Sequence, residues 1–139
     1  MGVDKLYSEI LEEFQNATTK ADRLAVLRKY NDARFREFLQ LAMDPDVKFD
    51  VEVPNYRPAQ EPAGLNFSYL HIEMPKIYRF IAGHPKRPQG LTPQKQKQLL
   101  LVVLESLHKD EAQLLVDAIT KKFKVKNLTQ NLISEAYGI

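Results

Sequence analysis

The chain has 139 residues, which is enough for one domain with its own hydrophobic core. It contains no cysteine, which excludes a disulfide framework, a thiol nucleophile and a thiolate metal site, and which fits a reducing compartment. No apolar run approaches the ~18 residues that a membrane-spanning helix needs, and the charged, amphipathic N-terminus does not follow a signal-peptide pattern. We therefore expect a single domain, residues 1–139, that works in the cytoplasm and away from membranes.

The formal net charge is only +2, but it is unevenly distributed. Residues 1–83 carry 11 Lys and Arg against 13 Asp and Glu, a net of −2. Residues 84–126 carry 9 against 4, a net of +5, and residues 127–139 add −1. The basic character therefore lies in the second half of the chain.

The first 45 residues predict three helices, each with one apolar stripe. The first covers residues 4–16. The second begins after Thr18 or Thr19, which would act as its N-cap, and runs to about Tyr30. The third follows the helical spacing of residues 35–42 and ends at Asp44-Pro45.

Residues 46–53 alternate apolar and charged side chains, the period typical of a strand. Prolines at positions 54, 58 and 62 prevent a regular sheet beyond it, and no second strand is predicted to pair with it. We therefore predict a long extended loop over about 44–72 whose apolar side packs on helices. Its acidic residues do not have the spacing of a calcium-binding loop, so we expect no metal there.

The longest apolar run, residues 99–104, predicts the element around which the rest is arranged. Thr92-Pro93 supplies an N-cap and a proline at the first helical position, and strong helix formers follow. These signals predict a central helix at about 93–108. Because six consecutive apolar residues leave no polar face, we expect this helix to be buried all round, with four residues fully buried: Leu100, Val103, Leu104 and Leu107.

Three further helices complete the prediction. One covers residues 74–82. Another is capped by Asp110, keeps its apolar face as far as Phe123, and ends among lysines. The last is capped by Asn127 and runs to about Tyr137. The fold class predicted is all-α: a compact single domain of six or seven helices.

No catalytic pattern emerges from the sequence. The three histidines, at positions 71, 84 and 108, are scattered and form no metal-ligand pair. Neither a phosphate-binding glycine loop nor a nucleophile elbow is present, and no two carboxylates stand out as an acid/base pair. We expect no enzyme activity, no metal and no cofactor.

Two basic segments flank the predicted central helix. Lys86 and Arg87 precede its N-terminus, where free backbone N–H groups favour phosphate. Four lysines lie between the last two helices, where they would grip a duplex backbone: Lys121, Lys122, Lys124 and Lys126. The alternative is that these are solvated lysines of the kind found at helix ends in any soluble protein.

The order of segments resembles the small N-terminal DNA-binding domain of ATP-dependent DNA ligases of the T-even phage type, over nearly the whole chain. Residues 10–32, from Ile10-Leu11-Glu12-Glu13 to Tyr30-Asn31-Asp32, resemble that domain's opening helices. Residues 35–45, from Phe35-Arg36-Glu37 to Met43-Asp44-Pro45, resemble the next helix and its exit. Residues 86–92 resemble its basic loop containing Thr and Gly. Residues 123–139, especially 127–133 and Tyr137-Gly138-Ile139, resemble its closing stretch.

The sequence departs from that family in two ways. The adenylation motif Lys-x-Asp-Gly is absent; the nearest string is Lys20-Ala-Asp22-Arg23, which lacks the glycine. The family usually has a glycine near Lys124-Val125, and this chain has none there. We therefore expect a stand-alone, non-catalytic domain without the nucleotidyltransferase part.

The resemblance implies binding to double-stranded or nicked DNA through its backbone, with little base specificity, in the host cytoplasm if the protein is phage-encoded. The residues it assigns to nucleic-acid binding are Lys86, Arg87, Thr92, Lys121, Lys122, Lys124, Lys126 and Asn127. The main alternative is a protein-interaction module that docks on a replication or repair protein such as a sliding clamp. A third reading is a detached subunit beside a separate catalytic chain.

Overall fold

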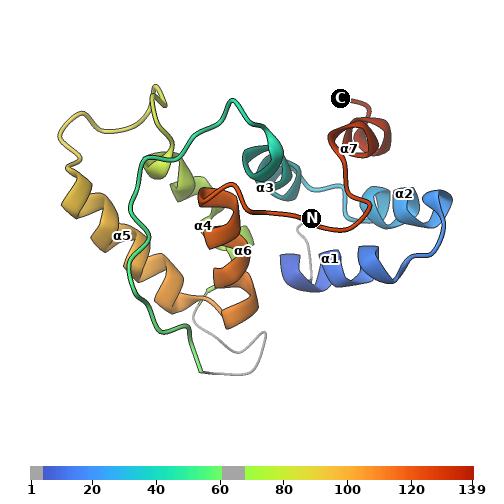
Figure 1. Ribbon diagram of the computed structural model, residues 1–139, viewed down its shortest axis with the longest axis horizontal. Coiled ribbons are helices and arrows are strands. Elements are labelled where there is room, and N and C mark those ends of the chain that lie inside the picture. Colours follow the sequence, from blue (N-terminus) through green and yellow to red (C-terminus); the bar gives the residue numbers. More distant parts are fainter. Residues whose placement is uncertain (1–4, 61–67) are drawn as a thin grey trace.

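The computed structural model describes residues 5–60 and 68–139, and these form seven α-helices and one 3-10 helix with no named β-strand among them (Figure 1). The elements are α1 (Tyr7–Asn16), α2 (Lys20–Lys29), α3 (Ala33–Met43), α4 (Leu70–Glu73), η1 (Met74–Phe80), α5 (Pro93–Ser106), α6 (Lys109–Ile119) and α7 (Gln130–Tyr137). The all-α fold class predicted from the sequence is confirmed.

The helices share one hydrophobic core. In Figure 1, α1, α2, α3 and α7 lie on one side of the molecule and α5 on the other, with α6 between them. Side chains from all of these helices belong to one continuous cluster of buried residues. An aromatic group sits within it, where the Tyr7 ring lies 5.0 Å from that of Phe35 and 5.5 Å from that of Phe38, between centroids. The described residues therefore pack as a single unit.

A buried carboxylate on α6 ties two other segments to the core. Glu111 is fully buried; its Oε2 accepts the N–H of Ser8 at 3.0 Å, and its Oε1 accepts the N–H of Leu70 at 3.1 Å. Both N–H groups lie in the first turn of a helix, where no intrahelical acceptor exists. Burial raises the pKa of Glu111, and these backbone donors oppose that rise. Glu111 thus fixes the starts of α1 and α4 against α6.

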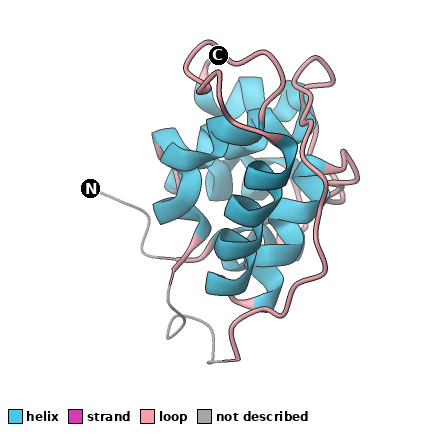
Figure 2. Ribbon diagram, turned by 90° about the vertical axis from the view of Figure 1, so that its left-hand side faces the viewer, coloured by secondary structure: helices cyan, strands magenta, loops and turns pink. Residues whose placement is uncertain are grey.

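The extended loop predicted over about 44–72 is present in its described part, and it ends at Tyr69 because α4 begins at Leu70. Its first part, residues 44–60, is called the strap below. Figure 2, with the α5 side facing the viewer, shows a long loop running down beside the helices. The strap follows α5: the Arg57 N–H donates to Glu105 at 3.1 Å, and the Ala59 N–H donates to the Leu107 carbonyl at 3.0 Å. Residues 61–67 of the predicted loop lie outside the described part of the chain.

Helix α5 has the predicted start and the predicted buried face. Thr92 caps it, accepting the Lys95 N–H at 3.1 Å. Each of Leu100, Val103, Leu104 and Leu107 is at most 3% exposed. The prediction that the helix is buried all round is wrong, because Val102 is 68% exposed. The apolar run at 99–104 therefore predicted the helix correctly, but it did not show which of its faces the other helices would cover.

The segment predicted as a helix at 74–82 is a 3-10 helix that follows the single turn of α4. Pro75 has no N–H to give to the carbonyl of His71, four residues earlier. That carbonyl instead accepts from the Arg34 guanidinium at 3.0 Å. The α-helical ladder is therefore interrupted where the 3-10 helix begins.

Two predicted caps are also corrected. His108, not Asp110, caps α6, accepting the Asp110 N–H at 3.2 Å. Thr129, not Asn127, caps α7. Asn127 has φ 69°, a left-handed conformation, whereas an N-cap residue has extended backbone. No helix in the described residues is long and apolar enough to cross a membrane.

Candidate nucleic-acid interface

The richest set of predicted site residues lies between α6 and α7, in residues 120–129, called the connection below. Helix α6 ends at Ile119, earlier than predicted, and Lys121 has φ 59°. The Lys121 N–H donates to the Ala118 carbonyl at 3.3 Å, and the Lys122 N–H donates to that of Asp117 at 2.8 Å. These two bonds around a left-handed residue form a Schellman motif. The left-handed position, held here by Lys121, is usually occupied by glycine. The predicted lysines therefore lie beyond the helix, not on its last turn.

Lys121 is engaged by the fold. Its ammonium donates to the carbonyls of Leu41 at 2.6 Å and Asp44 at 3.0 Å, at the C-terminal end of α3. It also lies 5.3 Å from the ring centroid of Phe49 in the strap. Loss of solvent around the amine lowers the pKa of Lys121. This lysine therefore joins α3, the strap and the connection, and its ammonium is engaged by backbone carbonyls.

The next three lysines of the connection are exposed. Burial alternates along this stretch: Lys122, Lys124 and Lys126 face solvent, whereas Phe123 is partly buried and Val125 is 9% exposed. The Phe123 ring packs edge-on against Phe38 with centroids 5.7 Å apart. Within the described chain, no carboxylate pairs with any of the three lysines. The packing of the two apolar residues thus leaves three lysines exposed at alternate positions of the connection.

Asn127 completes the connection. Its left-handed backbone makes a turn in which the Leu128 N–H donates to the Val125 carbonyl at 3.0 Å. Asparagine tolerates this conformation better than most residues do. Its side chain is exposed, next to Lys126 and two residues before the Thr129 cap of α7.

A depression of about 390 Å³ borders the connection on the α3 side. It is lined by Ala42, Met43, Pro45, Lys121 and Phe123. The hollow is thus bordered by three apolar side chains, Met43, Pro45 and Phe123, and by Lys121, whose ammonium is bonded to the end of α3. The sequence predicted Phe123 only as part of the apolar face of a helix, and its position between two lysines is the one local signal that could have set it apart.

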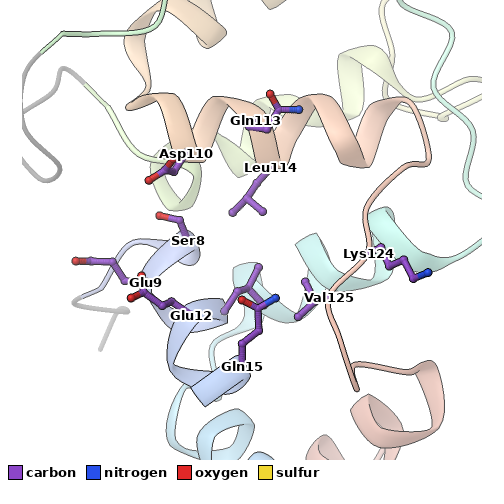
Figure 3. A pocket seen from close by; sticks show the side chains of 10 residues that line it. Ser8, Glu9, Glu12, Gln15, Asp110, Gln113, Leu114, Lys124 and Val125 are labelled. Atoms are coloured by element: carbon purple, nitrogen blue, oxygen red, sulfur yellow. The ribbon is translucent and has the colours of Figure 1, made fainter. Parts of the chain in front are cut away.

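A larger groove of about 630 Å³ lies between α1 and α6, and Figure 3 shows its lining. Leu11, Leu114 and Val125 contribute its apolar surface. Its polar side chains include three carboxylates, on Glu9, Glu12 and Asp110. Lys124 also borders the groove, but in Figure 3 its ammonium points away from these carboxylates. The groove therefore joins an acidic end to one exposed lysine of the connection.

The other predicted segment, the loop at residues 84–92, is used differently. One guanidinium nitrogen of Arg87 lies 2.7 Å from each carboxylate oxygen of Asp50 and also donates to the Ile81 carbonyl at 3.2 Å. Burial would raise the pKa of Asp50, but the bonds from Arg87 and Gln96 outweigh it and hold that pKa below the ordinary value. Thr92 is engaged as the cap of α5. Within this loop, Lys86 is an exposed cation that has no carboxylate partner in the described chain.

The structure divides the predicted site residues into two groups. Arg87 and Lys121 contact neighbouring residues of the strap, Asp50 and Phe49, and act as structural cations. In Figure 1, the loop at 84–92 leads into the start of α5, whereas the connection runs from the end of α6 to α7. Among the residues the structure describes, no three His, Asp or Glu side chains gather as a metal-binding group.

Comparison with known proteins adds a family but no activity. Residues 10–125 match a family of unknown function, DUF6433, and this range includes the connection as far as Val125. Neither a curated protein nor a solved structure matches the chain. Since the match covers most of its length, the chain belongs to the DUF6433 family.

Proposed function

We propose that the protein binds duplex DNA through its phosphate backbone, using Lys122, Lys124 and Lys126. The observation that carries the proposal is the row of three exposed lysines, alternating with packed apolar residues and without carboxylate partners in the described chain. The resemblance of the sequence to ligase DNA-binding domains is a second, weaker support.

The alternation suits a nucleic-acid backbone. In extended chain, residues two apart are separated by about 6.6 Å, which is close to the spacing of successive phosphates along a strand. Contacts to phosphate position a protein without reading bases. The expected binding is therefore weak and independent of sequence.

The salt dependence of binding tests the proposal. Each phosphate contact contributes about 0.9 to the slope of log affinity against log salt, so three lysines give a slope of about −2 to −3. Lys122→Glu with Lys126→Glu should reduce affinity for all duplex sequences alike and bring the slope close to −1. Fluorescence anisotropy with a labelled 20-base-pair duplex measures both quantities.

A charge-matched control shows whether DNA binding depends on the lysines of the connection or only on the net charge of the protein. Lys95→Glu with Lys109→Glu changes the net charge equally at two exposed lysines in first helical turns, where a carboxylate suits the helix dipole. This control should retain the wild-type slope. Equal losses in both variants, or no duplex binding by the wild-type protein at about 50 mM salt, would overturn the proposal.

The groove between α1 and α6 favours a second candidate function, the docking of a protein partner. Its apolar surface and its three carboxylates fit an amphipathic segment rich in Lys and Arg. Glu12→Lys with Asp110→Lys should abolish binding of a basic amphipathic peptide and leave DNA binding intact. Unchanged peptide affinity in this variant would exclude the groove.

A further inference from the structure

The groove between α1 and α6 carries opposite charges at its two ends. Its three carboxylates, on Glu9, Glu12 and Asp110, lie toward one end in Figure 3. Lys124 lies at the other end, beyond Val125. All four charged side chains are exposed. The groove is therefore a surface with a direction, from a negative end through an apolar middle to a positive end.

These charges are not paired with one another inside the chain. Glu9 accepts the Leu6 N–H at 2.9 Å, and Asp110 lies 3.8 Å from a ring nitrogen of His108. Among the residues that the structure describes, no Lys or Arg pairs with any of the three carboxylates, and no carboxylate pairs with Lys124. The groove therefore suits a partner that presents the same charges in the reverse order.

A second copy of the chain presents that reverse order. When two grooves face each other and run in opposite directions, a two-fold axis relates them, and every contact occurs twice. The acidic end of each copy then meets Lys124 of the other. In the arrangement where the grooves run in the same direction, the carboxylates would face carboxylates. Charge therefore selects the antiparallel arrangement.

The floor of the groove suits a lysine side chain. Leu11 and Val125 are buried, and Leu114 is partly buried, so the middle of the groove is apolar. The carbon stem of a lysine lies along such a surface while its ammonium reaches a carboxylate. Lys124 of a second copy would thus occupy part of the volume of about 630 Å³. Because two helices and one connection form the whole contact, the interface is small and self-association should be weak.

We propose that the protein forms a two-fold dimer through the groove between α1 and α6, in which Lys124 of each copy pairs with the carboxylates of Glu9, Glu12 and Asp110 of the other. This inference rests on the second candidate function, because it names the partner of the same groove. The basic segment that docks there is the connection of a second copy. Since Lys124 cannot contact a phosphate while it lies in that groove, the dimer and duplex DNA compete for it.

The first experiment is sedimentation equilibrium of the wild-type protein at concentrations up to about 1 mM, where weak interfaces are populated. We expect a reversible equilibrium between monomer and dimer. Dimerisation should be weaker at about 500 mM salt than at about 50 mM, because salt screens exposed ion pairs. A protein that stays monomeric throughout, or a dimer that salt does not weaken, would overturn the inference.

The second experiment reverses the charges at each end of the groove. Lys124→Glu in one variant, and Glu12→Lys with Asp110→Lys in another, place like charges opposite each other at both equivalent contacts. Each variant should dimerise about 5- to 100-fold more weakly than the wild type. Lys122→Glu is the matched control, because it changes the same charge on a neighbouring exposed lysine that does not line the groove. An equal loss in this control would overturn the inference.

The third experiment restores the complementary charges. An equimolar mixture of the two variants should form a heterodimer that is tighter than the homodimer of either, because both contacts then join opposite charges. All three substitutions in one chain should restore the homodimer for the same reason. Thermal unfolding shows that each variant is folded. No recovery in the mixture or in the triple variant would overturn the inference.

A basic amphipathic peptide separates this inference from the second candidate function. If the groove holds a second copy, the peptide should compete with it and convert the dimer to monomer. A wild-type protein that binds the peptide but stays monomeric without it would overturn the dimer and leave the docking function standing.

Discussion

The loop at residues 84–92 and the connection at residues 120–129 are both basic, yet the fold treats their cations differently. In the loop, Arg87 pairs with Asp50, and one lysine remains exposed. In the connection, Lys121 is bonded to the end of α3, whereas three other exposed lysines have no carboxylate partner in the described part of the chain. Cations that hold the fold together and cations available to a partner thus look the same in a sequence. The difference lies in whether an acceptor from elsewhere in the chain reaches them.

The largest effect expected from this comparison is on stability, at Arg87. Arg87→Met removes the pair with Asp50 and the bond to the Ile81 carbonyl. Hydrogen bonds to charged groups contribute about 1.5–3 kcal/mol when buried, and the exposed side of Asp50 reduces this to about 1–2 kcal/mol. Urea unfolding should show this loss while duplex affinity stays nearly constant. A large loss of duplex affinity with unchanged stability would show that Arg87 contacts DNA and does not act as a structural cation.

A smaller effect on stability is expected at Lys121. The hydrogen bonds of its ammonium stabilise the fold, whereas its left-handed backbone destabilises it. Lys121→Met removes the bonds to the end of α3 and should cost about 1 kcal/mol. Lys121→Gly removes the same bonds but relieves the left-handed strain at φ 59°, which is worth about 1 kcal/mol, so it should be close to neutral. Thermal unfolding of the pair measures the difference. Equal destabilisation by both variants would show that the backbone strain is negligible.

The ion pair between Asp50 and Arg87 also makes a pH-dependent contribution to the free energy of unfolding. Because the pKa of Asp50 is lowered below 3.8 in the folded protein, the unfolded chain binds the proton first as the pH falls. The contribution is therefore complete above about pH 5 and is lost as the pH drops through the lowered value. The stability gap between wild type and Arg87→Met should narrow in acid, by less than about 1 kcal/mol because Asp50 is half-exposed. A gap that widens in acid contradicts this sign.

The smallest effect is expected at Lys86, which is exposed in the loop at 84–92 and has no carboxylate partner in the described chain. Lys86→Glu should change stability by less than about 0.5 kcal/mol. It should also change duplex affinity less than Lys122→Glu does, at every salt concentration tested. An equal loss in the two variants would place the loop in the same interface as the connection.

The sequence by itself determined that the chain is helical and where several of its helices begin, because these signals are local. The Thr19 and Thr92 caps, the Pro93 start and the buried spacing of Leu100, Val103 and Leu104 all appear as predicted. Apolar periodicity and capping depend on residues three or four apart, so a sequence window contains the whole argument. The alternation of lysines and apolar residues over 122–126 was also present in the sequence. Its structural interpretation depended on where α6 ended, because the sequence predicted that the helix continued to Phe123.

Only the tertiary structure decided which polar groups are engaged. Arg87 meets Asp50 across 37 positions, Lys121 meets Leu41 across 80, and Glu111 meets Ser8 across 103. The exposure of Val102 and the depression beside Phe123 likewise depend on which elements pack against them. Such contacts form because the core brings distant segments together and leaves each polar group either satisfied or in solvent. No local pattern records that choice, which is why the candidate site was visible in the sequence only as an unsorted set of basic residues.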